Sequence, residues 1–273
     1  MEARDLEGVA ARVRGRIVEL SHAAGAPHLG SSLSCVDILV ALYWHAAALD
    51  PSRADDPVRD RVILSKGHAA PALYVALAER GFFEPELLDT FGDPGGRLAE
   101  QPSPGCVPGV EAATGSLGHG LAIGLGMAEA ARLAGRDSRV FCVLSDGECN
   151  EGSTWEAVLA AAARGLDRVM AIVDFNRWQA TGRSTEVLAL DPLADKFEAF
   201  GWSTTEVDGH DLAALTSLLE GLPDGSGKPV AVIANTVKGK GVSFMEDDNN
   251  WHYRIPNGEE VEAARRELGL TPA

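Results

Sequence analysis

The sequence predicts an α/β fold with a doubly wound, mainly parallel sheet and helices on both faces. Short apolar runs alternate with segments of helical periodicity along most of the chain, which is typical of such a sheet. The clearest unit combines strands at Arg139–Leu144 and Arg168–Val173 with an Ala-rich helix at Glu151–Arg164 between them. Because parallel strands end at the same edge of a sheet, we expect the polar residues that follow the two strands to meet in a ligand crevice.

The other elements are expected in chain order around this unit. Apolar residues at helical spacing predict a helix over Glu2–Ala24, which Gly25 and Pro27 end. A polar loop around His28 should lead into a helix over Ser34–Ala47 with Ser34 and Asp37 as a capping box. We expect further strands at 61–64, 202–207 and 229–236, and further helices after the SKGH segment, at 85–91, within 113–135, and at 191–200, 212–222 and 258–268.

Composition and charge exclude several classes of protein. With 45% hydrophobic and 23% charged residues, the 273-residue chain is expected to form a single globular domain with a C-terminal extension from about residue 238. The net charge of −16 argues against nucleic-acid binding. No apolar run approaches the ~20 residues of a membrane span, and the charged N-terminus lacks a secretory signal, so a cytoplasmic location is expected.

Four scattered cysteines lack the spacing of a zinc site or a redox pair. Cys142 lies in a predicted buried strand, where it should act as a small hydrophobic residue. Cys149 lies at the predicted crevice, where it is either a bystander or an oxidation-sensitive thiol.

Oxygen-bearing side chains follow both strands of the central unit. Asp146 ends the first strand, and Asn176 and Trp178 follow the second. A carboxylate, an amide oxygen and a main-chain carbonyl suit a hard divalent cation such as Mg²⁺, and the following helix N-terminus suits phosphate groups. Ordinary turns after two strands are the alternative reading of these residues.

The pattern SDG, helix, then DFN resembles the thiamine-diphosphate motif, whose usual form is GDG followed by an Asn about thirty residues on. Ser145 stands in place of the first Gly. From about His22 to Gly269 the chain is similar to the N-terminal half of transketolases, especially the split kind in which this half is a separate subunit. The similar segments, in order, are HLGSSLS, ILSKGHAAPALY, PGVEAATGSLGHGLAIGLGMA, SDGECNEG and KGKGVSFMEDDNNWHY.

The resemblance implies a thiamine-diphosphate-binding fold and a set of site residues. Asp146, Asn176 and the main-chain oxygen of Trp178 would bind Mg²⁺, for which Ca²⁺ or Mn²⁺ could substitute. Other residues would contact the cofactor, either at its diphosphate or between the phosphates and the aminopyrimidine: Gly147, Asn176, Gly115, Ser116 and Leu117.

The resemblance also assigns residues close to the chemistry. His68 and His252 would hold phosphate oxygens near the reacting centre, and His28 would face substrate hydroxyls. Glu151 would join a carboxylate network that couples the two cofactors of a dimer. The family places a histidine where this chain has Gln101, and a small residue where it has Tyr253. The change at Gln101 suggests an altered donor or acceptor, because Gln cannot become a cation.

The implied activity is transfer of a two-carbon ketol unit from a ketose-type donor to an aldehyde acceptor with thiamine diphosphate. The activating Glu belongs to a pyrimidine-binding domain, which we expect on a separate C-terminal transketolase subunit, with two copies of each chain and no activity without it. The substrate would be a small sugar phosphate or a 2-oxo acid. Two alternatives are open: a thiamine-diphosphate-dependent decarboxylase or carboligase acting on a 2-oxo acid, and a non-catalytic regulatory subunit.

Overall fold

Five apolar runs of the chain pair into one parallel sheet. In the computed structural model, which describes residues 3–270, the strands are β1 (Arg61–Leu64), β2 (Val140–Ser145), β3 (Val169–Phe175), β4 (Ser203–Asp208) and β5 (Val230–Asn235). Their order in the sheet is β1-β2-β3-β5-β4, and every pairing is parallel. The five predicted strands and the α/β fold class are confirmed.

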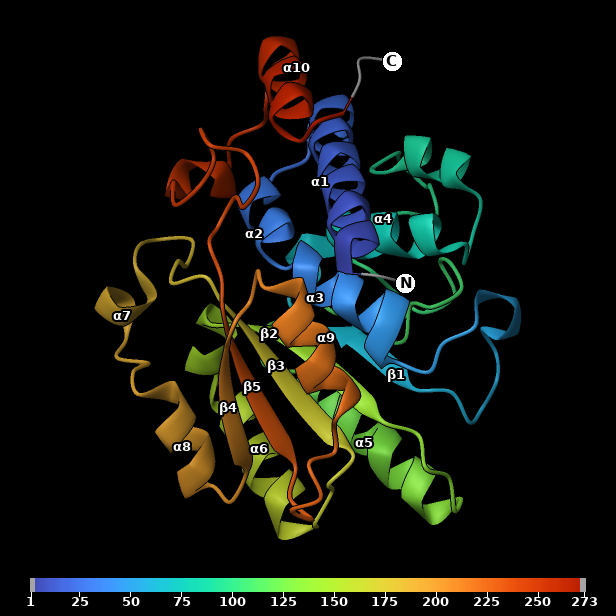
Figure 1. The fold of residues 1–273 in the computed structure, drawn as a ribbon, viewed down its shortest axis with the longest axis vertical. Coiled ribbons are helices and arrows are strands. Elements are labelled where there is room, and N and C mark those ends of the chain that lie inside the picture. The colour runs from blue at the N-terminus through green and yellow to red at the C-terminus, as the bar shows by residue number, and fades with distance from the viewer. Residues whose placement is uncertain (1–2, 271–273) are drawn as a thin grey trace.

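Helices cover both faces of this sheet (Figure 1). The core on one face is built from α3 (Val36–Ala41), α4 (Ala70–Arg80) and α9 (Leu212–Glu220), with α1 (Ala3–Ala24) packed on α3 and α4. The other packs against α5 (Gly120–Leu133), α6 (Gly152–Ala163) and α8 (Leu193–Ala199). Side chains of β2 alternate between the two cores, with Phe141 and Val143 in the first and Cys142 and Leu144 in the second, as a pleated strand requires.

The chain winds across the sheet in two directions. It advances from β1 through β2 and β3 to the edge strand β4, and then returns through α9 to β5, which lies between β3 and β4. The helix α9 covers the opposite face from α6 and α8, as expected when every parallel crossover keeps the same hand. The doubly wound arrangement predicted from the sequence is therefore confirmed.

The helix predicted at Ser34–Ala47 is wrong in both its start and its continuity. The structure has α2 (Leu29–Ser34), α3, and a π-helical turn at Leu42–Ala46. Ser34 is the last residue of α2 rather than a cap, because its hydroxyl donates to buried Asp174. Asp37 accepts from Arg14 instead of closing a capping box. Contacts distant in sequence thus override the local capping pattern.

The remaining elements are short. They are α7 (Ser184–Val187), α10 (Gly258–Glu267) and the 3₁₀ turns Pro51–Arg53, Gly67–Ala69, Pro85–Thr90, Gly147–Asn150 and Asn249–His252. The helix α10 packs against α1, and the turn Asn249–His252 packs against α2. The predicted helix start at Glu2 lies outside the described residues. Among residues 3–270, no helix combines the length and apolarity needed to span a membrane.

All four cysteines are free and buried. Burial raises the pKa of the Cys149 thiol well above its ordinary value, so that the reactive thiolate is disfavoured. Of the two readings of Cys149, this favours the bystander.

Candidate active site

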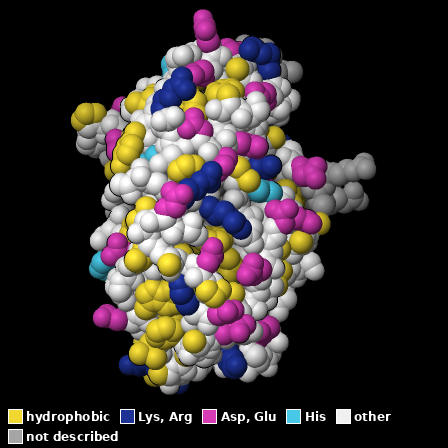
Figure 2. Space-filling model, turned by 90° about the vertical axis from the view of Figure 1, so that its left-hand side faces the viewer, with side chains coloured by type: hydrophobic (Ala, Val, Ile, Leu, Met, Phe, Trp, Pro, Cys, Tyr) yellow, Lys and Arg dark blue, Asp and Glu magenta, His cyan; other side chains and the backbone are white. Residues whose placement is uncertain are grey.

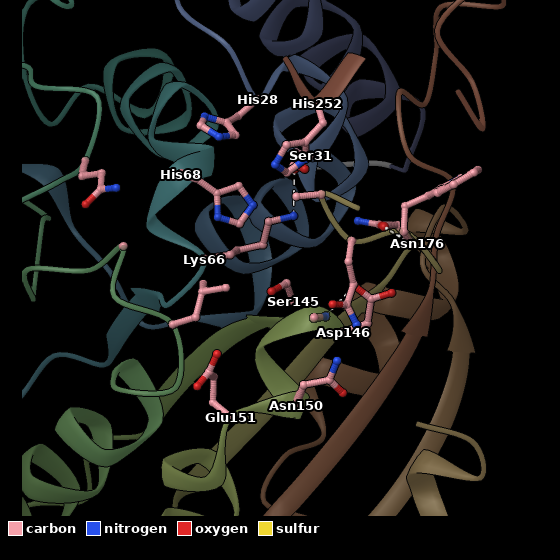
Figure 3. Close-up of a pocket in the computed structure, with 17 residues that line it drawn as sticks. His28, Ser31, Lys66, His68, Ser145, Asp146, Asn150, Glu151, Asn176 and His252 are labelled. Carbon is pink, nitrogen blue, oxygen red and sulfur yellow. Dashed lines mark hydrogen bonds between the residues drawn. The ribbon is translucent and has the colours of Figure 1, made fainter. Parts of the chain in front are cut away.

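A cavity of about 360 Å³ opens at the carboxyl ends of β1, β2 and β3 (Figure 3). Three histidines lie at one end of it, and Asp146, Asn150 and Glu151 lie at the other. Its wall includes every site residue predicted from the sequence except Ser116, which is exposed beside it. Those lining residues are His28, His68, Gln101, Gly115, Leu117, Asp146, Gly147, Glu151, Asn176, Trp178 and His252.

Asp146 lies at the end of β2, where it is buried completely. Its Oδ2 accepts from Ser184 Oγ at 2.6 Å, and its Oδ1 accepts from the Gly147 N–H at 2.8 Å. Burial raises the pKa of Asp146 to about 6, and the nearby carboxylate of Asp174 adds to this effect. A buried carboxylate in this state is stabilised by a cation.

Asn176 follows β3 on the same side of the cavity. Its Nδ2 donates to Ser34 Oγ at 3.3 Å and to Asp174 Oδ2 at 3.4 Å, while Oδ1 accepts from the Trp178 N–H at 3.0 Å. These contacts determine which end of the amide is the oxygen. In the described part of the chain, no three His, Cys, Asp or Glu side chains gather as a metal cluster, so a cation here would depend on Asp146 and neutral oxygens.

Two buried polar atoms beside Asp146 lack a partner. Asn150 Oδ1 and Gln179 Nε2 belong to residues that line the cavity, and neither makes a hydrogen bond within the described chain. Such atoms are rare in folded proteins unless a ligand or water satisfies them. A hydrated cation with an anionic diphosphate offers both a donor for Asn150 and an acceptor for Gln179, so the residues present fit these groups.

His28, His68 and His252 come from three separate segments and meet at the cavity. Their ring centroids are 4.9 to 5.9 Å apart. His28 holds a left-handed backbone conformation (φ 70°) as the N-cap of α2 and donates its main-chain N–H to the His252 carbonyl at 2.8 Å. The close approach of these segments therefore depends on main-chain contacts as well as on the rings.

Burial lowers the pKa of all three histidines, and repulsion from neighbouring histidines or lysines lowers the values further. For His252 the pKa falls to about 3. The rings are thus neutral near pH 7, where each offers one N–H donor and one acceptor rather than a positive charge.

The positive charge near the cavity comes from lysines that were not predicted from the sequence. Lys66 follows β1, lines the cavity, and donates to the Ser31 carbonyl at 2.7 Å and to Asp174. Lys238 follows β5 and lies behind His252. The sequence offers one weak signal for these lysines. Lys66 closely follows an apolar run, and Lys238 lies in the Gly-rich segment KGKG.

Gln101 packs against Gly115 at the exposed rim. A Cβ on Gly115 would lie 2.1 Å from Gln101 Oε1, and the φ of Gly115 is +127°, so only glycine fits here. Between these two loops, the Thr114 N–H donates to the Pro102 carbonyl at 3.3 Å. Gln101 therefore has a defined position beside the segment predicted to line the cofactor.

The buried carboxylate of the α6 entry is Glu148, which was not predicted from the sequence. Its Oε1 accepts from Ser65 Oγ and from the Gly118 N–H. The predicted residue Glu151 is exposed at the edge of the cavity. Glu148 thus connects the ends of β1 and β2 to the start of α5.

Comparison with known proteins agrees with this geometry. Residues 8–273 match the family model described as the transketolase thiamine diphosphate binding domain. The chain is 40% identical to an apulose-4-phosphate transketolase subunit of Phocaeicola vulgatus over 98% of this chain and 95% of that protein. It is 39% identical to the 6-deoxy-6-sulfo-D-fructose transketolase subunit SqwG of a Clostridium species, over 97% and 96% of the two chains.

Among solved structures, the transketolase of Campylobacter jejuni superimposes with a TM-score of 0.89 at 28% identity. The match covers 99% of this chain and 43% of that one, so the chain spans less than half the length of that transketolase. The subunit relatives, by contrast, have nearly the same length as this chain. Together with the cavity at the carboxyl edge of the sheet, these matches establish that the chain belongs to the transketolase family and corresponds to its thiamine-diphosphate-binding domain.

Proposed function

We propose that this chain is the N-terminal subunit of a two-component transketolase. It would transfer a two-carbon ketol unit from a ketose-type donor to an aldehyde acceptor with thiamine diphosphate and Mg²⁺. The observation that carries the proposal is one cavity that joins the Asp146 and Asn176 oxygens to three neutral histidines. Thiamine diphosphate, when bound, supplies the carbanion-stabilising chemistry of such a transfer.

Separate groups of residues would bind the metal ion, the diphosphate and the middle of the cofactor. Asp146, Asn176 and the carbonyl of Trp178 would hold Mg²⁺, since these are hard oxygen ligands. Gly147, Gln179 and the helix entry at α6 would hold the diphosphate through N–H groups. Gly115, Ser116 and Leu117 would lie along the middle of the cofactor.

The histidines would bind and move protons at the substrate end. A neutral imidazole can donate from one nitrogen and accept at the other, which suits the exchange of a proton with a sugar hydroxyl. His28 would face the donor hydroxyls, and His68 and His252 would contact phosphate oxygens. Gln101 at the rim would bind the substrate by hydrogen bonds alone.

We propose that the substrate is a ketose that differs from common sugar phosphates at the end facing Gln101. Relatives of this length are named for apulose-4-phosphate and for 6-deoxy-6-sulfo-D-fructose, which are unusual sugars. The names of these relatives, together with the Gln101 substitution, support a specialised donor over an ordinary ketose phosphate.

A separate subunit would complete the site. The relatives named as subunits share the length of this chain, and we propose a partner with the pyrimidine-binding domain, two copies of each chain, and Glu151 at the junction. The face of α5 and α6 suits this contact, because Ile123, Leu133 and Leu159 are exposed on it. Figure 2 shows hydrophobic side chains gathered on the lower part of the molecule, at the level of α6 and α8 in Figure 1.

The glycines of α5 divide between the two sides of that helix. A Cβ on Gly120 would lie 2.1 Å from Ser65 Oγ and one on Gly124 would lie 2.4 Å from Cys142 Sγ, so these two permit packing on the sheet. Gly126 has open space around it and is exposed. The outward side of α5 thus remains for a partner.

We also propose a cytoplasmic location, which the four free, buried cysteines support.

The decisive experiment removes the carboxylate of Asp146. In the complex with its partner subunit, Asp146→Ala should weaken Mg²⁺-dependent binding of thiamine diphosphate at least about a hundredfold in calorimetric titration, since an anionic ligand is lost. Asp55→Ala, at an exposed position in the loop before β1, is the matched control and should bind normally. Unchanged affinity in a folded Asp146→Ala variant would refute the proposal.

A further inference from the structure

A buried lysine stands behind one of the three histidines. Lys238 is fully buried and does not line the cavity, whereas His252 does. Lys238 Nζ lies 3.1 Å from His252 Nδ1 and 2.7 Å from Asn249 Oδ1. The imidazole therefore has its Nδ1 turned to a lysine inside the protein and its other nitrogen, Nε2, on the cavity side.

Hydrogen-bond chemistry decides which nitrogen of His252 carries the proton. A lysine ammonium has three donors and no lone pair, so it can interact with Nδ1 only where Nδ1 is an unprotonated acceptor. Burial lowers the pKa of Lys238 to about 8, which leaves most of it charged at pH 7. Burial also keeps the His252 ring neutral, because its pKa falls to about 3. A neutral ring with an unprotonated Nδ1 must have its proton on Nε2.

Contacts of Asn249, of the neighbouring residue Val237 and of Gly30 hold Lys238 in position. Asn249 donates its Nδ2 to the Ala180 carbonyl at 3.2 Å, which leaves its Oδ1 as the end that faces Lys238. The Val237 N–H donates to His210 Nε2 at 2.8 Å, and His210 Nδ1 pairs with Asp37 at 2.7 Å. The lysine stem lies against Gly30, where an added Cβ would be 3.0 Å from its Cγ.

His28 and His68 differ from His252 in this respect. Among residues 3–270, no side chain donates to or accepts from the ring nitrogens of either residue. Both tautomers of those rings are therefore open, and a ligand can select between them. Of the three cavity histidines in the described chain, His252 alone has its tautomer set by a protein contact before a ligand arrives.

We propose that Lys238 is a positioning residue that holds His252 as the neutral Nε2–H tautomer, so that a hydrogen-bond donor faces the anionic group in the cavity. The inference rests on the proposed function, in which that group is the diphosphate or a substrate phosphate. A donor fixed in advance costs no rearrangement when an anion binds, whereas the opposite tautomer would direct a lone pair at it.

The tautomer can be measured without cofactor or activity. Long-range ¹H–¹⁵N NMR of the full chain labelled in its histidines separates protonated from unprotonated ring nitrogens, and His252→Gln assigns the signals. We expect unprotonated Nδ1 and protonated Nε2 in the unsubstituted chain. Lys238→Arg should keep this state because guanidinium is also a pure donor, whereas Lys238→Met should give a mixture of both tautomers. Asn249→Ala, which removes the second acceptor of the Lys238 ammonium, should change the tautomer populations of His252 less than Lys238→Met does.

Binding provides a second readout. Lys238→Met should raise the Kd for thiamine diphosphate with Mg²⁺ about tenfold, the loss of one hydrogen bond to a charged group, while Lys238→Arg should restore most of the affinity. Lys240→Met, at a partly exposed lysine paired with Glu246, is the matched control and should change neither readout.

Two results would overturn the inference: a protonated Nδ1 in the unsubstituted chain, or a tautomer that Lys238→Met leaves unchanged. Either one would leave the Asp146-dependent binding of the cofactor intact. Failure of the proposed function, by contrast, would show as an affinity for thiamine diphosphate that Asp146→Ala leaves unchanged, while the NMR state of His252 stayed as expected.

Discussion

Lys66 and Asp174 form an ion pair in which both side chains are completely excluded from solvent. The pair connects the end of β1 to the end of β3 across the intervening strand β2. Asp174 also accepts from Ser34 Oγ at 2.6 Å and from Thr236 Oγ1. Burial opposes both charges, but the partner's charge outweighs it, so the pKa of Lys66 is raised and that of Asp174 is lowered.

Loss of the Lys66 charge should be costly. We expect Lys66→Met to lower the free energy of unfolding by about 3–5 kcal/mol, because it leaves a buried carboxylate without its partner. Urea denaturation measures the change. Arg132→Met is the control: Arg132 pairs with Glu129 on the exposed side of α5, and loss of such a solvent-screened surface pair should leave the free energy of unfolding nearly unchanged. Equal effects of the two substitutions would contradict this account.

The backbone of Gly115 provides a second test. Gly115→Ala should destabilise the chain and weaken thiamine diphosphate binding about tenfold, because the new methyl group would displace Gln101 from the rim. Gly105 also has a positive φ, +83°, but nothing lies within 4 Å of its Cβ position. Gly105→Ala should therefore cost only the backbone strain of about 1–2 kcal/mol. If calorimetry found normal binding in both variants, the rim would not influence the cofactor.

Gln101 should control the choice of donor. We expect Gln101→His to raise kcat/KM for ordinary ketose phosphates relative to the native donor by about tenfold, since a restored imidazole can exchange a proton as well as donate a hydrogen bond. Gln101→Ala, which removes both abilities, should lower kcat/KM for every donor. Steady-state kinetics with paired donors gives the ratio, and an unchanged ratio in Gln101→His would exclude Gln101 as a specificity residue.

The exposed apolar face of α6 should mediate association. Leu159 is 56% exposed, so Leu159→Glu should change the stability of the isolated chain by no more than about 0.5 kcal/mol. Binding to the partner subunit should weaken by about 2 kcal/mol or more, as at the centre of an interface. Val58→Glu is the matched control, because Val58 is 60% exposed in a different region. Analytical ultracentrifugation distinguishes loss of the partner from loss of contact between two copies of this chain.

The chain by itself should show no turnover. Within residues 3–270 the cavity is lined by two acidic side chains. Asp146 lies beside the proposed Mg²⁺ ligand Asn176, and Glu151 lies at the exposed edge of the cavity. The activating carboxylate of the aminopyrimidine is thus expected from the partner subunit. Assays of the purified chain with excess thiamine diphosphate and Mg²⁺ check this, with the two-subunit complex as the positive control. Appreciable activity of the chain alone would refute the need for a partner.

Residue patterns along the chain were enough to predict the sheet and the location of the site. Apolar runs such as Arg168–Val173 are typical of buried parallel strands, whose polar ends then share one edge of the sheet. That geometry brought Asp146 to the same cavity as Asn176 without any knowledge of distances. The histidines were reached through motif resemblance, since a lone loop histidine carries no positional signal of its own.

The contacts that hold the site residues in place could not be predicted, because they join segments that are distant in the sequence. The Ser34 hydroxyl had a local use as a helix cap and a distant one at Asp174, and burial of that carboxylate decided between them. Lys66 and Lys238 lie within the segments SKGH and KGKG, but nothing there indicates their burial, because a lysine is ordinarily a solvated surface residue. Lys66 acquires its role from a carboxylate 108 residues away in the sequence, and Lys238 from an imidazole 14 residues away. Burial beside such partners is a property of the folded chain alone, because it depends on which segments the sheet brings together.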